Sequence, residues 1–246
     1  MLGNITINKT GLRAIETYYE PIMNKNYDSV IAYRTQVRVN DPHIGVLLPQ
    51  IYLPVAERTT LANKISLWAI NDISSTVPKL KSRGAYFEFI AVYVPVNLLI
   101  SEEFCMNFLK ALKENGASAS DICIEVSSSI FTYDIKIIQR ALLKFSENGI
   151  KTMLSGLGIG SAFIGRLEKL HFDYIILDNI LSNNLVSTNE REIAMANSIF
   201  ELVSAQGSIA IATGVNNMDI KHSLPKACVN FTGNQAGRIK KAVSIR

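Results

Sequence analysis

The 246-residue chain contains only three cysteines, and no two of them form a C-x-x-C pair. Cys105, Cys123 and Cys228 are an odd number, and their spacing does not indicate a disulfide framework. Two of them lie in apolar runs typical of strands, so we interpret the cysteines as small buried hydrophobic residues. This usage fits a reducing compartment, and we expect the protein to be cytoplasmic.

Signals for membranes and metals are also lacking. The N-terminal MLGNITINKTGLRAI has no continuous apolar stretch of the signal-peptide kind, and no window approaches the ~18 uninterrupted apolar residues of a spanning helix. We therefore expect no membrane association. None of the three histidines has H-E-x-x-H or similar spacing, and we interpret His43, His171 and His222 as surface or packing residues. We expect no metal site and no cofactor.

An excess of positive charge is lacking outside the C-terminus. The chain has 25 Lys and Arg against 21 Asp and Glu, but residues 221–246 hold six of the basic residues and no acid. Residues 1–220 therefore carry 19 basic and 21 acidic side chains, which is not the charge pattern of a nucleic-acid-binding protein. We expect no direct contact with nucleic acid. The basic C-terminal run predicts a solvated final helix that could contact a partner through Arg238, Lys240 and Lys241.

The chain has 48% hydrophobic residues, enough for a full-sized core. From residue 83 onward, β-branched or aromatic runs alternate with segments of helical periodicity, and glycines mark many joints. The predicted strands are 85–96, 121–126, 150–157, 174–179, 208–215 and 227–233. The predicted helices are 101–115 with Ser101 as N-cap, 134–148, 161–171, 189–206 and 217–226.

Upstream, strand-like runs at 14–23 and 29–39 are separated by the polar NKNYDS, which predicts a hairpin. A further helix is expected near 58–75. Eight strands with outer helices in ~250 residues predict a TIM-like (β/α)8 barrel, in which the opening hairpin makes one strand antiparallel. Because no low-complexity segment or interior linker appears, we expect residues 1–246 to form a single domain.

Function in such a barrel lies at the C-terminal ends of the strands, and these ends contain few carboxylates. Glu125 and Asp178 are the acids there, and no nucleophile with a neighbouring base can be recognised. A hydrolytic two-metal site needs several oxygen ligands around ions ~3.5–4 Å apart. The strand ends of this chain do not supply them.

Several segments nevertheless match one family in order and spacing. YYEPI at 18–22 is similar to Y-x-Q-P-I, and LLPQIYLPVAERTTL at 47–61 is close to P-x-x-F-I-P-x-A-E-x-T-G-L. Further matches are VPVNLL (94–99), ICIEVSSS (122–129), the long segment 149–179 and IAIATGVNN (209–217). Over about 18–240, the chain resembles the EAL domain family, barrel enzymes that hydrolyse the bacterial second messenger cyclic di-GMP with two divalent metals.

The resemblance implies that the functional positions have changed. Arg34 stands where the E-A-L motif has its metal-binding Glu, and Ile176 stands where the family has its catalytic Lys. Asn97 and Glu125 persist as vestigial metal-site positions. The remaining metal and catalytic positions hold Ser155, Gly156, Thr213, Asn216 and Thr232. We therefore predict a degenerate EAL domain, a pseudoenzyme without phosphodiesterase activity. The family's dimerisation loop is also altered, at Ser128, Ile159 and Ser161, so the oligomeric state stays open.

Two classes of function follow from this resemblance. In the first, the barrel binds a cytoplasmic regulatory protein, as degenerate EAL proteins do when they restrain transcriptional regulators of motility or biofilm formation. Phe104 and Phe108 on the 101–115 helix, or the basic C-terminal residues, could contact that partner, although the aromatic stripe is also typical of core packing.

In the second class, the chain is a metal-free cyclic di-GMP receptor. Arg34 and Arg38 share one strand face and could clamp a phosphate. We favour a different arrangement, in which Arg34 pairs with Glu125 across the mouth and blocks the pocket. Binding of cyclic di-GMP is then expected to be weak or absent.

Overall fold

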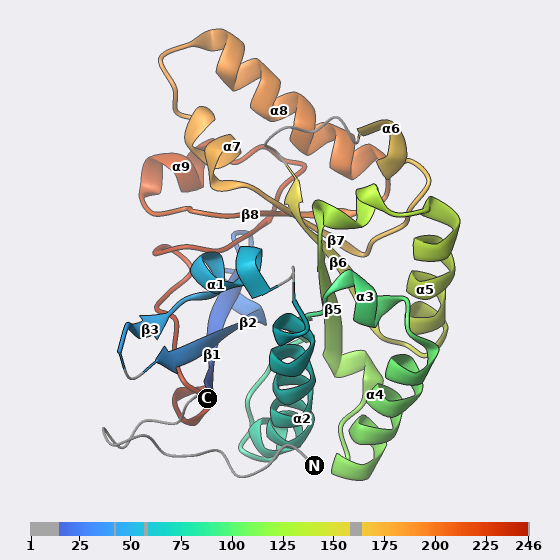
Figure 1. The fold of residues 1–246 in the computed structure, drawn as a ribbon. Coiled ribbons are helices and arrows are strands. Elements are labelled where there is room, and N and C mark those ends of the chain that lie inside the picture. Colours follow the sequence, from blue (N-terminus) through green and yellow to red (C-terminus); the bar gives the residue numbers. More distant parts are fainter. Residues whose placement is uncertain (1–14, 42, 57–58, 158–163, 246) are drawn as a thin grey trace.

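The computed structural model describes residues 15–41, 43–56, 59–157 and 164–245 (Figure 1). Eight strands form a closed barrel, in the order β1-β9-β8-β7-β6-β5-β4-β2, and the pairing of β1 with β2 closes the ring. These strands are β1 (Ile15–Asn24), β2 (Ser29–Asp41), β4 (Ile90–Tyr93), β5 (Ile122–Ser127), β6 (Lys151–Leu157), β7 (Tyr174–Leu177), β8 (Ile209–Ala212) and β9 (Asn230–Phe231). The predicted TIM-like barrel is confirmed.

The opening hairpin gives the barrel its one antiparallel strand, as the sequence predicted. β1 runs antiparallel to both β2 and β9, and β2 then pairs in parallel with β4. The register sets Glu20 opposite Arg34 and Tyr18 opposite Gln36. A short strand that the sequence analysis missed, β3 (Gly45–Leu47), pairs with the outer part of β2 and lies outside the ring.

Helices surround the strands, and Figure 1 shows α2, α4, α5 and α8 on the outside of the barrel. Their bounds are α1 (Pro49–Ala56), α2 (Leu61–Ser82), α3 (Val96–Leu99), α4 (Glu102–Asn115), α5 (Ile135–Glu147), α6 (Ile164–Leu167), α7 (Asn179–Asn184), α8 (Glu190–Ala205) and α9 (Met218–Ser223). Short 3-10 turns occupy Ala119–Asp121, Ser128–Thr132 and Ala242–Ser244. The sequence analysis missed α1, α3 and α7. The expected helix at 161–171 ends early, because α6 ends at Leu167, and the one expected at 217–226 is shorter, because α9 covers Met218–Ser223.

The N-terminus of α4 shows why the local prediction succeeded there. The Ser101 hydroxyl accepts a hydrogen bond from the Phe104 amide at 3.2 Å, which satisfies one of the free N–H groups of the first turn. Gly116 ends the helix in the left-handed conformation, at φ 73°. The helix begins one residue after its predicted cap and ends at the predicted position.

Two buried clusters hold the fold together. A small cluster lies inside the barrel and consists of Ile22, Ile31, Ala32, Phe89, Ala91, Cys123, Met153, Tyr174, Ile176 and Ile211. A larger cluster fills the space between the strands and the helices. Because successive residues of a strand point to opposite faces, most of the barrel strands contribute to both clusters. The rings of Phe89 and Tyr174, 4.6 Å apart, cross the barrel interior.

The aromatic stripe of α4 belongs to the larger cluster. Phe104 and Phe108 are only 5% and 3% exposed, and both rings pack against Phe145 of α5. Their assignment as partner contacts is therefore wrong, because neither ring is available on the surface. The alternative interpretation of the stripe as core packing is confirmed.

The predicted final helix is also wrong. The backbone of Lys240 forms an antiparallel bridge with Tyr19 of β1, with hydrogen bonds of 2.8 and 3.0 Å. The Lys241 ammonium binds the Glu16 carboxylate at 3.0 Å. These contacts hold the basic run along β1 instead of leaving it as a solvated helix.

The cysteines behave as small core residues. Cys105, Cys123 and Cys228 are buried, and burial raises the pKa of each thiol, in Cys228 to about 12. In the part of the chain that the structure describes, no helix is long and apolar enough to cross a membrane.

Candidate functional site

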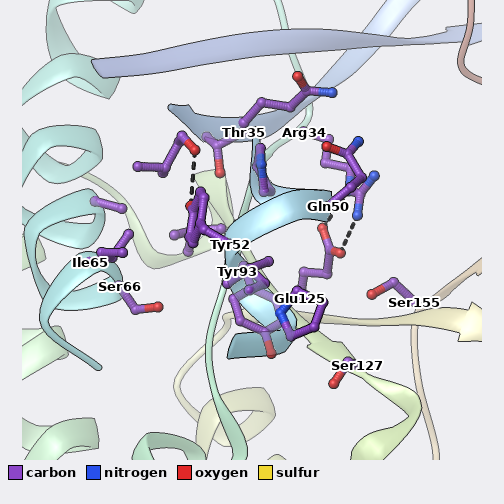
Figure 2. A pocket seen from close by; sticks show the side chains of 17 residues that line it. Arg34, Thr35, Gln50, Tyr52, Ile65, Ser66, Tyr93, Glu125, Ser127 and Ser155 are labelled. Atoms are coloured by element: carbon purple, nitrogen blue, oxygen red, sulfur yellow. Dashed lines mark hydrogen bonds and ion pairs between the residues drawn. The ribbon is translucent and has the colours of Figure 1, made fainter. Parts of the chain in front are cut away.

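The mouth of the barrel is dominated by one ion pair. Arg34 on β2 donates through Nε and Nη2 to the two carboxylate oxygens of Glu125 on β5, and both bonds measure 2.6 Å (Figure 2). The Glu125 side chain is 4% exposed and that of Arg34 is 27% exposed. This bidentate geometry is the strongest arrangement available to an Arg and a carboxylate. The predicted pairing across the mouth is confirmed.

A second carboxylate approaches the same guanidinium. Glu20 on β1 lies 3.6 Å from Arg34 Nη1. Burial alone would lower the pKa of Arg34, but Glu125 and Glu20 outweigh this effect and raise it, so Arg34 stays charged. Burial raises the pKa of Glu20, and Glu125 raises it further, against the opposing effect of Arg34. Glu20 is therefore a surplus negative charge beside a pair that is already complete.

Two cavities adjoin this ion pair, and Arg34 lines both. The smaller, of about 300 Å³, lies between β2 and the helices α1 and α2 (Figure 2). Tyr52 of α1 lines it and donates a hydrogen bond to the Val37 carbonyl at 2.9 Å, which ties α1 to β2. Most other side chains on its helical walls are apolar, among them Leu53, Ile65 and Ala69.

The larger cavity, of about 720 Å³, occupies the mouth itself. Neutral amides and hydroxyls supply most of its polar lining: Gln36, Gln50, Ser155, Asn179, Thr213, Asn216, Thr232 and Asn234. Arg238 also lines this cavity, so this residue of the basic C-terminal run lies at the mouth. The acidic and basic residues of this lining balance one another, and the remaining polar residues are neutral. Neither sign of charge is therefore in strong excess at the mouth.

Arg38 does not join Arg34 at the mouth. Both residues lie on the same face of β2, as predicted, but the Arg38 guanidinium stacks 3.7 Å above the Tyr18 ring centroid. Arg38 lines neither of the two mouth cavities. The two arginines therefore do not form the phosphate clamp that was considered as the alternative to the Arg34–Glu125 pair.

The other predicted positions are divided between the core, the surface and the mouth. Asn97 is exposed on α3, and its side-chain oxygen accepts from the Leu98 amide next to it. Ile176 belongs to the cluster inside the barrel. The Thr213 hydroxyl donates to the Leu177 carbonyl at 2.8 Å, and that of Ser155 donates to the Val126 carbonyl at 3.4 Å.

Two aspartates near the strand ends have structural partners. Asp173 accepts from both the amide and the hydroxyl of Thr152, at 2.7 and 3.0 Å. Asp178 caps α7 by accepting from the Ile180 amide at 3.0 Å. Both carboxylates therefore stabilise local backbone at the ends of β7.

Glycines at two strand ends permit close backbone approach. Gly233 has φ +120°, and a Cβ atom added there would lie 2.6 Å from the Val215 amide nitrogen. Gly214 has φ +73°, and a Cβ atom added there would lie 2.7 Å from the Cβ atom of Asn179. The interpretation of these glycines as turn residues is confirmed. Gly158 and Gly160, and the altered loop positions Ile159 and Ser161, lie outside the described residues.

Residues 9–232 match the EAL domain in a comparison with protein families. The chain belongs to the EAL domain family. Its fold agrees, because the structure titled "PaMucR Phosphodiesterase, c-di-GMP complex" superposes with a TM-score of 0.84 at 21% identity, covering 95% of this chain and 94% of that one. At this identity the likeness establishes the fold alone.

Curated relatives of this EAL domain share little identity with it. A probable cyclic di-GMP phosphodiesterase of Escherichia coli, PdeG, is 22% identical over 221 residues, which are 88% of this chain and 43% of that protein. An uncharacterized protein of Mycobacterium tuberculosis is 22% identical over 203 residues, 82% of this chain and 32% of that protein. The EAL domain thus spans less than half of the length of these relatives.

The two divalent metals implied by the family do not fit the donors present at this mouth. Both oxygens of Glu125 bind Arg34, Glu20 faces the same guanidinium, and Asp178 caps a helix. Throughout the described ranges, no three His, Cys, Asp or Glu side chains gather in a group that could hold a metal ion. A cation placed beside Glu125 would also meet the positive charge of Arg34.

Sequence reasoning missed the role of several mouth residues of this EAL domain. Gln36 is two residues beyond Arg34 on β2, so strand alternation was a usable signal for it. Glu20 could have been placed opposite Arg34 from the hairpin register. Gln50 and Tyr52 come from α1, which was not predicted, and no local signal placed them at the mouth.

The two carboxylates around Arg34 should differ in their effect on stability. Glu125→Gln removes the bidentate partner of a partly buried cation and should lower the free energy of unfolding by about 2–4 kcal/mol at pH 7. Glu20→Gln, the matched variant, removes a surplus charge and should change it by less than about 1 kcal/mol. Urea denaturation monitored through Trp68 measures both.

The pH dependence gives this comparison a second readout. Because the pKa of Glu20 is raised above its ordinary 4.5 in the folded protein, ionisation of Glu20 opposes folding. The stability of the wild type relative to Glu20→Gln should therefore fall as the pH rises from about 4.5 through the raised pKa, and then level off. Equal losses in both variants at pH 7 would contradict the assignment of Glu125 as the principal partner.

Proposed function

We propose that this EAL domain is a catalytically inactive regulator that acts by binding a cytoplasmic regulatory protein. The expected partner is a regulator of transcription that controls motility or biofilm genes, as the family resemblance implies. One observation carries the loss of catalysis: Arg34, at the position of the family's metal-binding Glu, holds both oxygens of Glu125. A cation at this position replaces a negatively charged metal ligand with a positive charge, which repels a metal ion.

The neighbouring positions support the same conclusion. Metal-assisted phosphodiester cleavage needs ligands that hold the ions and a group that moves a proton. Ser155, Gly156 and Thr213 offer no negative charge, and Ile176 is a buried hydrocarbon without a titratable proton. Losses within such a catalytic unit are non-additive, so one restored carboxylate would recover little.

The preserved barrel supports a role other than catalysis. The ring of strands is closed, Gly233 keeps its close approach to Val215, and Asp173 holds Thr152. These features stabilise the fold and take no part in the mouth chemistry. Protein binding requires an intact surface and no catalytic group, which fits this combination of a maintained scaffold and an altered site.

The first expected outcome concerns turnover. The purified protein should not hydrolyse cyclic di-GMP with Mg²⁺ or Mn²⁺, because most of the family's metal ligands and its proton-transferring group are replaced together. Arg34→Glu should also be inactive, since Ser155, Gly156, Ile176 and Thr213 remain. Chromatographic separation of linear and cyclic nucleotide measures this, with an active EAL phosphodiesterase as the positive control. Turnover above the buffer blank that a chelator abolishes would refute the proposal.

The metal-free receptor is the alternative function, and the contacts of both arginines count against it. Arg34 is held by Glu125, and Arg38 stacks on Tyr18, so neither guanidinium is free to offset two phosphates without losing its present partner. Cyclic di-GMP should therefore bind more weakly than ~10 µM, or about −7 kcal/mol. Calorimetric titration with and without Mg²⁺ measures the affinity. A submicromolar dissociation constant that is lost in Arg38→Ala would favour the receptor.

A further inference from the structure

Helix α5 presents an unusual stripe of side chains to solvent. Its members recur at helical spacing and are all exposed: Lys136, Gln139, Arg140, Leu143 and Ser146. Leu143 is 55% exposed, whereas its neighbour Leu142 is buried. Two cations and an exposed leucine therefore lie on one surface of α5, which Figure 1 shows on the outside of the barrel.

This stripe forms one wall of a groove of about 540 Å³. The rest of the lining comes from Leu142 of α5, Thr152 of β6, and Leu170 and His171, which precede β7. Three of the nine lining residues are leucines, two are permanent cations and none is a carboxylate. The groove is thus apolar at its base and basic along the α5 side.

The two cations of the groove have no salt-bridge partner within the described ranges, although Glu102, which lines a neighbouring pocket with Arg140, interacts with the Arg140 charge. Neither Lys136 nor Arg140 forms an ion pair with a residue of the described ranges, whereas Lys144 on the same helix binds Glu102 at 2.5 Å. In the basic C-terminal region, Lys221 and Lys241 are likewise bound to Asp28 and Glu16. Of the C-terminal residues predicted as partner contacts, Lys241 is thus paired, whereas Arg238 and Lys240 form no ion pair within the described ranges.

We propose that this groove binds an acidic, amphipathic peptide segment of the regulatory partner, an inference that rests on the proposed function. Carboxylates of the segment pair with Lys136 and Arg140, and apolar side chains pack against Leu143 and the buried Leu170. This combination of charge complementarity with an apolar base gives orientation as well as affinity.

The lining also distinguishes a peptide from other occupants. A phosphate backbone or anionic lipid surface would use the cations but would leave the leucine-lined base without an apolar partner of matching shape. A second copy of the chain would bring the same two cations to the groove, and like charges facing each other oppose that contact. An acidic segment with leucine-like anchors satisfies both features of the groove.

The first test uses the full chain and a defined probe. The probe is a fluorescent helical peptide of about 15 residues, with leucines at i, i+3, i+4 and i+7 and glutamates at most other positions. A matched peptide carries lysines in place of the glutamates. Fluorescence anisotropy should show saturable binding of the acidic peptide, weakened by salt, and no binding of the basic one.

Substitutions in the groove and on α4 test whether the acidic peptide binds at the groove. Lys136→Glu with Arg140→Glu should weaken the acidic peptide at least about tenfold, and Leu143→Ser should weaken it several-fold. The control is Lys110→Glu with Lys113→Glu, which makes the same charge change on exposed positions of α4 and should alter affinity less than about twofold. Equal losses in the groove and control variants, binding of the basic peptide, or no saturable binding would overturn the groove assignment.

A second test separates failure of the groove from failure of the proposed function. Wild type, the groove double variant and the α4 control are used to recover partners from the native cells. Loss of a reproducible partner in the groove variant alone, together with peptide binding, supports the proposal. Retention of the partner by all three proteins overturns the groove and leaves the regulator intact, whereas no partner for the wild type overturns the regulator.

Sedimentation of the purified chain completes the comparison. A monomer, or a dimer unaffected by Leu143→Ser, is expected. A dimer that Leu143→Ser dissociates would assign the groove to a second copy of the chain and overturn the peptide proposal.

Discussion

Arg34 and Glu125 meet through two hydrogen bonds of 2.6 Å across the barrel mouth, and the strand between them, β4, separates their own strands in the sheet. Removing two such charges from water is costly, and only close bidentate contact offsets this cost. The pair therefore resists separation. Any ligand that needs Glu125 must first displace a guanidinium, and any ligand that needs Arg34 must replace a carboxylate. Glu20 adds a second negative group beside the pair, which strengthens the hold on Arg34 at the expense of its own ionisation.

Most of the contacts that keep the barrel together do not involve the Arg34–Glu125 pair at its mouth. Strand pairing, the clusters on both sides of the sheet and the approach of Gly233 to Val215 place no requirement on residues 34, 125 or 155. Chemistry at the mouth can therefore change while the fold persists, and the surface stays available for binding. Ile176 shows how the two regions adjoin, because its side chain belongs to the cluster inside the barrel and also lines the mouth cavity. A scaffold of this kind can serve as a binding protein, and α5 presents Lys136 and Arg140, which form no salt bridge within the described ranges, beside the exposed Leu143.

Local patterns in the sequence predicted the eight barrel strands, the opening hairpin and the Ser101 cap, because alternation, turn composition and capping act over a few residues. They did not predict α1, a helix of eight residues with prolines at 49 and 54, whose place depends on contacts such as Tyr52 with Val37. The C-terminal run was mistaken for a helix because its partner, Tyr19, lies more than 200 residues away in the chain. At the mouth, strand-end positions predicted the Arg34–Glu125 pair. Alternation also placed Arg38 on the correct face, but the stacking on Tyr18 depends on a rotamer that alternation does not determine.

The central claim is that Arg34 has replaced the metal at Glu125, and manganese binding tests it most directly. Electron paramagnetic resonance of free Mn²⁺ measures how much of the ion the folded protein takes up. The ion pair predicts no site tighter than ~1 mM, and the same result for Glu125→Gln as for the wild type. Stoichiometric uptake of Mn²⁺ at micromolar concentration, lost in Glu125→Gln, would contradict the account.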